Sequence, residues 1–176
     1  MDVSKLWEHQ KTALERFKLR NNFAIFNGLG TGKTATAIYG YRQKCNTEKR
    51  VLKLLIVTPL ITLRNWKNEF AMHSKFNAED IVILDGTEKA RIALFQGSDK
   101  KIFLVNYEAL AVMPSLMDKI LVWSPEFLIF DESHRVKDVK SKRTKMAIKL
   151  SDKAKYKLIL TGTPVLNGPM DLFAQF

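Results

Sequence analysis

The stretch Asn27-Gly28-Leu29-Gly30-Thr31-Gly32-Lys33-Thr34 decides the fold of this chain. It follows the apolar run 23–26 and precedes the helix-prone run 35–39, so the sequence predicts a strand, a glycine-rich loop and a helix in that order. The glycines let backbone N–H groups approach an anion closely and permit the positive φ angles that such a loop needs. This arrangement is typical of a phosphate-binding loop, and an ordinary glycine-rich turn is the alternative.

The same stretch supplies the groups that ATP and Mg²⁺ require. The positive end of the helix that begins near Lys33 faces the anion, and the Lys33 ammonium can reach the outer phosphates. The Thr34 hydroxyl is a ligand for Mg²⁺. Asn27 stands where the usual pattern has glycine, but asparagine tolerates left-handed backbone angles. The predicted nucleotide-binding residues of the loop are Gly28, Gly30, Thr31, Gly32, Lys33 and Thr34.

A second decisive stretch, 126–134, is an apolar run that ends in consecutive acids. Adjacent residues of a strand point to opposite faces, so the acids can act separately. Asp131 is expected to hold Mg²⁺ through its water shell, and Glu132 to deprotonate the water that attacks the γ-phosphate. A solvated acidic turn is the alternative. His134 is expected to act as a switch near the γ-phosphate, with a surface or capping histidine as the alternative.

Apolar runs alternate with helix-prone segments along the chain. Strands are expected at 23–26, 51–58, 81–84, 101–105, 126–131 and 156–160, and helices at 6–20, from 35, 60–70, 87–95, 139–150 and from about 167. Nearly continuous apolar strands are typical of a parallel sheet buried on both faces. We therefore predict an α/β fold. Ligands of such sheets lie at the carboxyl ends of the strands, where Lys33, Asp131 and Thr161 would meet.

The composition favours one intracellular domain that binds a polyanion. The 176 residues fit a single domain, 1–176, and carry 29 Lys plus Arg against 18 Asp plus Glu, a formal charge of +11. Between 135 and 157 there are ten basic and two acidic residues, which suits nucleic acid. A soluble basic surface is the alternative.

The chain shows no targeting or membrane signal. Its only cysteine, Cys45, predicts a reducing compartment. No signal peptide and no apolar run approaching about 20 residues are present. We expect a cytoplasmic protein, nuclear if eukaryotic, with no membrane partner. Three histidines and one cysteine without ligand spacing argue against a structural metal site.

The ordered motifs resemble superfamily 2 helicases and translocases, and within them the Snf-type branch. They are, in chain order, 6–10, the loop to Thr34, 59–66 with 69–70, 106–110, 131–138 and 160–167. The resemblance implies a P-loop NTPase of RecA-like three-layer fold, with helices flanking a mainly parallel central sheet, and ATP-driven tracking along double-stranded DNA. The loop departs from the branch's usual Gly-Leu-Gly-Lys-Thr, as in other superfamily 2 motors, and Ser133 stands where alanine is commonest.

The resemblance also assigns roles to individual residues. Gln10 would read the adenine, since its amide presents a donor beside an acceptor, although a surface glutamine is the alternative. Thr161 and Thr163, with His134, would couple the nucleotide site to the DNA path. Residues in motifs that line the nucleic-acid groove are Thr58, Arg64, Asn65, Lys67, Asn106 and Tyr107. Trp66 and Tyr107 also fit a hydrophobic core.

The resemblance further implies a second RecA-like lobe, which is absent from these residues and supplies an arginine finger. Such a finger is worth about 10³–10⁵ in rate, so the isolated lobe is expected to be nearly inactive as an ATPase. The alternatives in the same class are a strand-separating DNA or RNA helicase and a restriction-enzyme motor. A non-catalytic nucleic-acid-binding module is the alternative from another class, and the acid pair argues against it.

Overall fold

A parallel sheet forms the centre of the computed structural model, which describes residues 6–28, 30–136, 138 and 140–162. All paired strands run parallel. They lie in the order β1-β6-β5-β2-β4-β3. The strands are β1 (Asn22–Ile25), β2 (Leu54–Thr58), β3 (Ile81–Ile83), β4 (Ile102–Asn106), β5 (Phe127–Asp131) and β6 (Tyr156–Leu160). The predicted α/β fold with a parallel sheet is confirmed.

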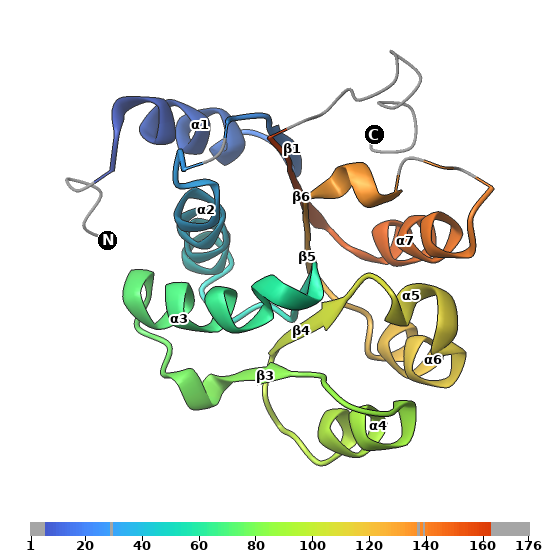
Figure 1. Ribbon diagram of the computed structural model, residues 1–176. Helices are drawn as coiled ribbons and strands as arrows, with labels where there is room; N and C mark the ends of the chain where they lie inside the picture. Colours follow the sequence, from blue (N-terminus) through green and yellow to red (C-terminus); the bar gives the residue numbers. More distant parts are fainter. Residues whose placement is uncertain (1–5, 29, 137, 139, 163–176) are drawn as a thin grey trace.

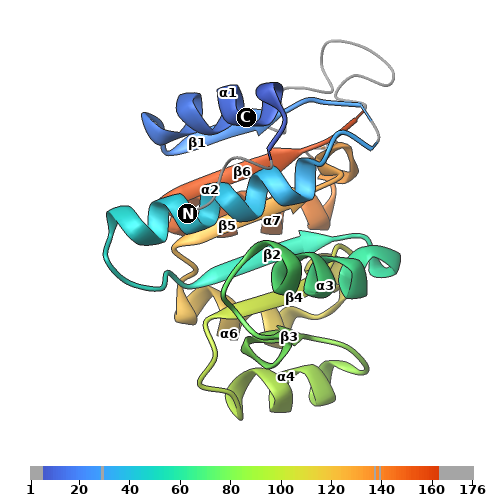
Figure 2. The same ribbon diagram turned by 90° about the vertical axis from the view of Figure 1, so that its left-hand side faces the viewer.

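Helices cover both faces of the sheet (Figure 1). One face carries α1 (Glu8–Lys18), α2 (Lys33–Thr47) and α3 (Leu63–His73), which lie in front of the strands in Figure 2. The other face carries α4 (Glu88–Gln96), α5 (Ala109–Val112), α6 (Pro114–Trp123) and α7 (Lys142–Lys153). Short 3₁₀ turns η1, η2 and η3 occupy Leu60–Thr62, Ala78–Asp80 and Ser133–Val136.

Alternate residues of the central strands enter different hydrophobic cores. Leu54 and Ile56 of β2 pack with side chains of α1, α2 and α3. Leu55 and Val57 pack with side chains of α4 to α7. Because side chains alternate with a period of two, a strand covered on both faces must be apolar throughout. This explains the nearly continuous apolar runs in the sequence.

Some elements differ from the sequence prediction. The segment predicted as one helix over 60–70 is a 3₁₀ turn followed by α3, which continues to His73. The basic helix α7 begins at Lys142, because the hydroxyl of Ser141 accepts a hydrogen bond from the Thr144 N–H at 3.1 Å and caps it. The helix expected from about 167 lies outside the described residues.

Helix α6 was not predicted from the sequence. Pro114 occupies its first turn, where proline is favoured. Its buried residues, Leu116, Met117 and Ile120, have the spacing of an amphipathic helix. These signals are local and were available in the sequence.

Three neighbouring strands end side by side and position the candidate site. Ile25 of β1 is paired with Leu160 of β6, which is paired with Asp131 of β5. The Thr161 N–H donates to the carbonyl of Ile25 at 3.2 Å. Since parallel strands share one carboxyl edge, the loop after β1 and the acids after β5 emerge there together.

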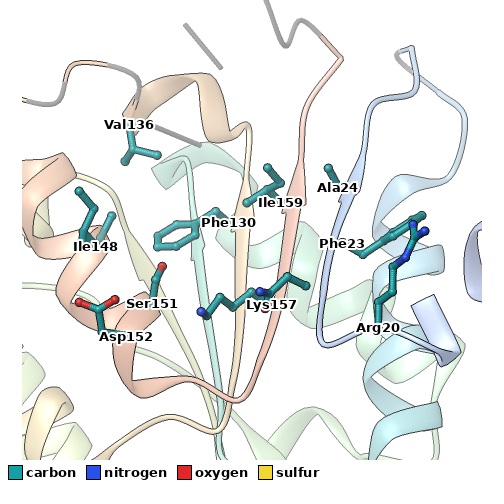
Figure 3. A pocket seen from close by; sticks show the side chains of 12 residues that line it. Arg20, Phe23, Ala24, Phe130, Val136, Ile148, Ser151, Asp152, Lys157 and Ile159 are labelled. Carbon is teal, nitrogen blue, oxygen red and sulfur yellow. The ribbon is translucent and has the colours of Figure 1, made fainter. Parts of the chain in front are cut away.

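A cavity of about 440 Å³ lies elsewhere, between α7 and strands β1 and β6 (Figure 3). Its walls include Ala24, Phe130 and Ile159 from three strands and Ile148 from α7. None of the described residues predicted to bind nucleotide or nucleic acid lines it. The cavity is therefore not the predicted nucleotide site.

Candidate nucleotide site and nucleic-acid face

Two of the three glycines in the loop have the positive φ angles that the sequence predicts, whereas Gly28 does not. Gly30 and Gly32 have φ angles of 74° and 70°. Gly32 is the N-cap of α2, so the unpaired N–H groups of that helix begin at the loop. A Cβ added at Gly28 or Gly30 would meet no atom within 4 Å. This open cradle at a helix N-terminus fits a polyphosphate.

The Lys33 ammonium lies against its own loop. Its Nζ donates to the carbonyls of Asn27 at 3.0 Å and Gly28 at 2.9 Å. These acceptors are neutral, and no acidic side chain in the described part of the chain forms an ion pair with Lys33. The charge of Lys33 is therefore available to an anion in the cradle. Thr34, half-buried, follows it at the start of α2.

Gln10, the residue expected to read the adenine, lies beside the loop, and its amide is already engaged. Its Nε2 donates to the carbonyls of Gly32 at 3.1 Å and Thr31 at 3.4 Å, and its Oε1 accepts from the Trp7 N–H at 2.9 Å. The side chain of Gln10 is 5% exposed. Contact with an adenine would therefore require the amide to exchange these partners. In this structure Gln10 braces the phosphate loop.

The carboxylate of Asp131 is held by neutral donors. Its Oδ2 accepts hydrogen bonds from the Thr58 hydroxyl and from the Trp66 indole N–H, both at 2.8 Å. Oδ1 has no donor among the described residues. This oxygen fits the expected role of Asp131, which is to hold a hydrated Mg²⁺.

Tyr107 supports the backbone of Asp131. Its hydroxyl donates to the Asp131 carbonyl at 2.7 Å, and its ring stacks on Phe130 at 6.3 Å between centroids. Burial, and to a smaller extent the Asp131 carboxylate, raises the pKa of Tyr107 well above its usual range. Tyr107 is therefore a neutral donor throughout the physiological pH range.

Glu132 leaves the strand in a left-handed conformation, with a φ of 52°. Such angles are uncommon outside glycine and cluster at functional sites. Its Oε2 lies 3.3 Å from His134 Nδ1 and 3.4 Å from Thr161 Oγ1, and these two atoms are 3.1 Å apart. The structure thus brings together the predicted base, the predicted switch histidine and one predicted coupling threonine. The other, Thr163, lies outside the described residues.

The residues predicted to line the nucleic-acid groove fall into two groups. Arg64 and Asn65 are exposed on α3, and Lys67 is half-buried there. The side chains of the other three are at most 4% exposed in this structure and do not form its surface: Thr58, Asn106 and Tyr107. Of these six residues, only the three on α3 therefore reach the surface of the described structure.

Arg91 explains the burial of Asn106. Its guanidinium donates to Asn106 Oδ1 at 2.5 Å, and the Asn106 amide donates to Glu108 Oε2 at 2.7 Å. Burial lowers the pKa of Arg91. Sequence reasoning missed this arginine, and also the donor role of Trp66. The sequence signal that could have revealed Arg91 is its position four residues before Phe95. This spacing places both side chains on the same, buried face of α4.

The basic segment 135–157 does not form one face. Helix α7 begins after the carboxyl end of β5 and ends just before β6 begins. Lys142 and Arg143 therefore lie near the carboxyl edge of the sheet, whereas Lys153 and Lys155 lie near the amino edge. The concentration of charge in the sequence is divided between two edges in the fold.

The parallel strand order, the glycine-rich loop and the acid pair define an α/β RecA-like fold of the P-loop class. A family model for the SNF2-related domain matches residues 9–176, and the chain belongs to this family. The Snf-type resemblance is thereby confirmed.

Curated relatives match almost the whole chain. It is 32% identical to an uncharacterized ATP-dependent helicase of Mycoplasma genitalium, over 99% of this chain and 17% of that protein. It is 30% identical to the chromatin structure-remodeling complex subunit snf21 of Schizosaccharomyces pombe, over 97% of this chain and 14% of that protein. The chain thus spans less than a fifth of the length of these relatives.

A solved structure shares the fold. The Sulfolobus solfataricus SWI2/SNF2 ATPase core in complex with dsDNA is 25% identical, with a TM-score of 0.73 over 95% of this chain and 33% of that one. None of the helices in the described ranges has the length and apolar character needed to cross a bilayer.

Proposed function

We propose that residues 1–176 are the ATP-binding lobe of an ATP-dependent DNA translocase of the SNF2-related family. The lobe would bind ATP with Mg²⁺ and the backbone of duplex DNA, and a second RecA-like lobe would complete the hydrolytic site. The observation that carries this proposal is the shared carboxyl edge of β1, β6 and β5, where the phosphate loop, Thr161 and the acid pair emerge side by side.

Each residue of the edge has a chemical task in this proposal. Lys33 and the N–H groups of the loop and of α2 bind the phosphates. Thr34 and Asp131 hold Mg²⁺, which when bound neutralises negative charge on the phosphate oxygens. Glu132 accepts the proton of the attacking water. His134 and Thr161 orient the Glu132 carboxylate, to which both lie within 3.4 Å.

The exposed side of α3 is the proposed contact with DNA. Arg64 and Lys67 would bind phosphates, and Asn65 would donate to a phosphate or a sugar. Such contacts position a protein on a duplex without reading sequence, as a translocase requires. The similar SWI2/SNF2 ATPase core, solved in complex with dsDNA, supports this choice of partner.

Nucleotide binding tests the first part of the proposal. Titration of a fluorescent ADP in the presence of Mg²⁺ should show saturable binding to this chain. Lys33→Ala should weaken that binding about 10- to 100-fold, because it removes a charge-assisted contact worth about 1.5–3 kcal/mol. Lys89→Ala, at an exposed lysine of α4, is the matched control. Equal affinity of the Lys33 variant and the control would contradict the proposal.

Salt-dependent DNA binding tests the second part. Arg64→Ala and Lys67→Ala should each weaken binding of a labelled duplex equally for all sequences, and each should reduce the slope of log affinity against log salt by about 1. Lys101→Ala, just before β4 at the opposite edge of the sheet, is the matched control. Loss of affinity in the Lys101 variant alone would place the DNA on the other edge.

Turnover tests the need for a second lobe. The isolated chain should hydrolyse ATP very slowly even with saturating duplex, since it lacks the arginine finger worth about 10³–10⁵ in rate. Rapid DNA-stimulated turnover by residues 1–176 alone would show that no second lobe is required.

A further inference from the structure

Three buried side chains around Asp131 have no role in the proposed function so far: Thr58, Trp66 and Tyr107. We propose that Thr58 and Trp66 are positioning residues that fix the Asp131 carboxylate for Mg²⁺, and that Tyr107 fixes the backbone at the same residue. This inference rests on the proposed function, because it gives the metal acid of that site its orienting groups. It also assigns to Thr58 and Tyr107 a task other than contact with nucleic acid.

The fold itself brings these donors to one carboxylate. Phe127 and Ile129 of β5 face the core under α1 to α3, as do Leu54 and Ile56 of β2. The period of two continues this pattern to Asp131 and to Thr58, the last residues of their strands. Since β2 and β5 are paired neighbours, the two side chains end side by side beneath α3.

Helix α3 supplies the second donor to the Asp131 carboxylate, the indole N–H of Trp66. Trp66 belongs to its buried face and is 1% exposed, in the same core as Leu54 and Phe127. Its indole has a single polar group, an N–H that can only donate. In this core the indole N–H needs an acceptor, and Asp131 Oδ2 provides it at 2.8 Å.

The chemistry of the donors suits a metal acid. A buried carboxylate needs hydrogen bonds, but a cation beside it would neutralise the charge that attracts Mg²⁺. Thr58, Trp66 and Tyr107 are all neutral donors, and no Lys, Arg or His within the described ranges forms an ion pair with Asp131. No cation among the described residues therefore competes with Mg²⁺ for this carboxylate, and two hydrogen bonds on Oδ2 restrict its rotation. Oδ1 is left for the hydrated ion.

The test compares nucleotide affinity with and without Mg²⁺. Thr58→Val removes the hydroxyl at nearly constant shape, Thr58→Ser retains it, and Trp66→Phe removes the N–H while keeping an aromatic ring. Fluorescent ADP is titrated into each variant in Mg²⁺ and in EDTA, and the ratio of the two affinities is measured. We expect Thr58→Val and Trp66→Phe to reduce the gain from Mg²⁺ by about 10- to 100-fold, as loss of groups that orient metal ligands does. Affinity in EDTA should stay within about twofold, and Thr58→Ser should restore the gain.

Tyr41→Phe supplies the matched control. Its hydroxyl is fully buried and donates to the Leu52 carbonyl at 2.8 Å, outside the candidate site. Tyr107→Phe, which removes an equally buried hydroxyl at the site, should reduce the Mg²⁺ gain while Tyr41→Phe leaves it unchanged. Thermal unfolding of each variant separates lost folding from lost positioning.

The outcomes distinguish this inference from the proposed function. If the unmodified chain gains no affinity from Mg²⁺, the proposed nucleotide site itself is wrong. If it gains affinity and Thr58→Val retains the whole gain, the positioning role is overturned. If Trp66→Phe does not fold, the comparison of Thr58→Val with Thr58→Ser decides the question alone.

Discussion

Lys33 and Asp131 at the carboxyl edge of the sheet and three ion pairs at its amino edge hold their charges in different ways. At the carboxyl edge, backbone carbonyls hold Lys33, and a hydroxyl with an indole N–H holds Asp131. At the amino edge, three basic side chains contact acids directly. The pairs there are Arg50–Glu126 at 2.5 Å, Lys155–Glu48 at 2.6 Å and Lys100–Asp80 at 3.1 Å. Charges held by dipoles remain free to act on a ligand, whereas charges paired with each other are already neutralised.

The pKa shifts at the amino edge follow from this pairing. The hydrogen bond from Arg50 lowers the pKa of Glu126, and the hydrogen bond from Lys155 lowers that of Glu48. Both acids therefore remain ionised at neutral pH as partners of a base. The comparison teaches that a basic excess in the sequence does not by itself locate the surface that binds a polyanion.

The largest expected effect is that of Glu132→Gln at the carboxyl edge, and the same substitution at Glu126, at the amino edge, is its control. Glu132→Gln, in a protein that carries both lobes, should lower DNA-stimulated phosphate release by about 10²–10⁴, the usual contribution of a positioned general base. Fluorescent ADP should still bind. Glu126→Gln should leave the rate unchanged, since its carboxylate pairs with Arg50 at the far edge. A rate within tenfold of the unmodified protein for Glu132→Gln would remove Glu132 from the chemistry.

A smaller effect, on stability, is expected from substituting a glycine of the phosphate loop. Gly32→Ala should destabilise the chain by about 1–3 kcal/mol, the cost of a left-handed non-glycine residue. The new methyl group would also collide with Gln10 Nε2. Gly28→Ala meets no atom and requires no positive φ, so it should unfold in urea at nearly the unmodified midpoint. Equal midpoints for the two variants would show that Gln10 does not brace the loop.

The smallest effect is expected at the amino edge. Glu126→Gln should lower the free energy of unfolding at pH 7 by no more than about 1 kcal/mol, because solvent screens an exposed pair. The pKa of Glu126 is lower in the folded chain than in the unfolded chain. Its contribution is therefore complete above the unfolded value of about 4.3 and disappears as the pH falls through the folded value. Denaturation at pH 7 and pH 3 should show a smaller difference between the two proteins at pH 3 than at pH 7.

The sequence was sufficient for two local patterns that define the candidate site. The glycine-rich loop between a strand and a helix, and the acids at the end of an apolar run, are contiguous patterns, and the parallel sheet brings them to one edge. The alternating cores follow from strand periodicity. Helix α6 also had a local signal, in Pro114 and the apolar spacing behind it, and was missed.

The partners of the site residues could not be predicted in this way. Trp66 is 65 positions from Asp131 in the sequence, and its indole N–H reaches that acid only because α3 packs in the same core as residues of β2 and β5. The burial of Asn106 depends on Arg91 from another helix. The resemblance of their motifs assigned Thr58, Asn106 and Tyr107 to a groove, whereas tertiary packing decides which side of the chain each one faces.

Helix α3 gives this arrangement a mechanical consequence. Its inner side carries the indole bonded to Asp131, and its outer side carries Arg64 and Asn65, all within 11 residues of one rigid element. A load on the outer side that shifts the helix across the sheet must lengthen or bend the bond to Asp131 in the same movement. Helix α3 therefore links the proposed DNA contact to the proposed nucleotide site through the hydrogen bond between Trp66 and Asp131.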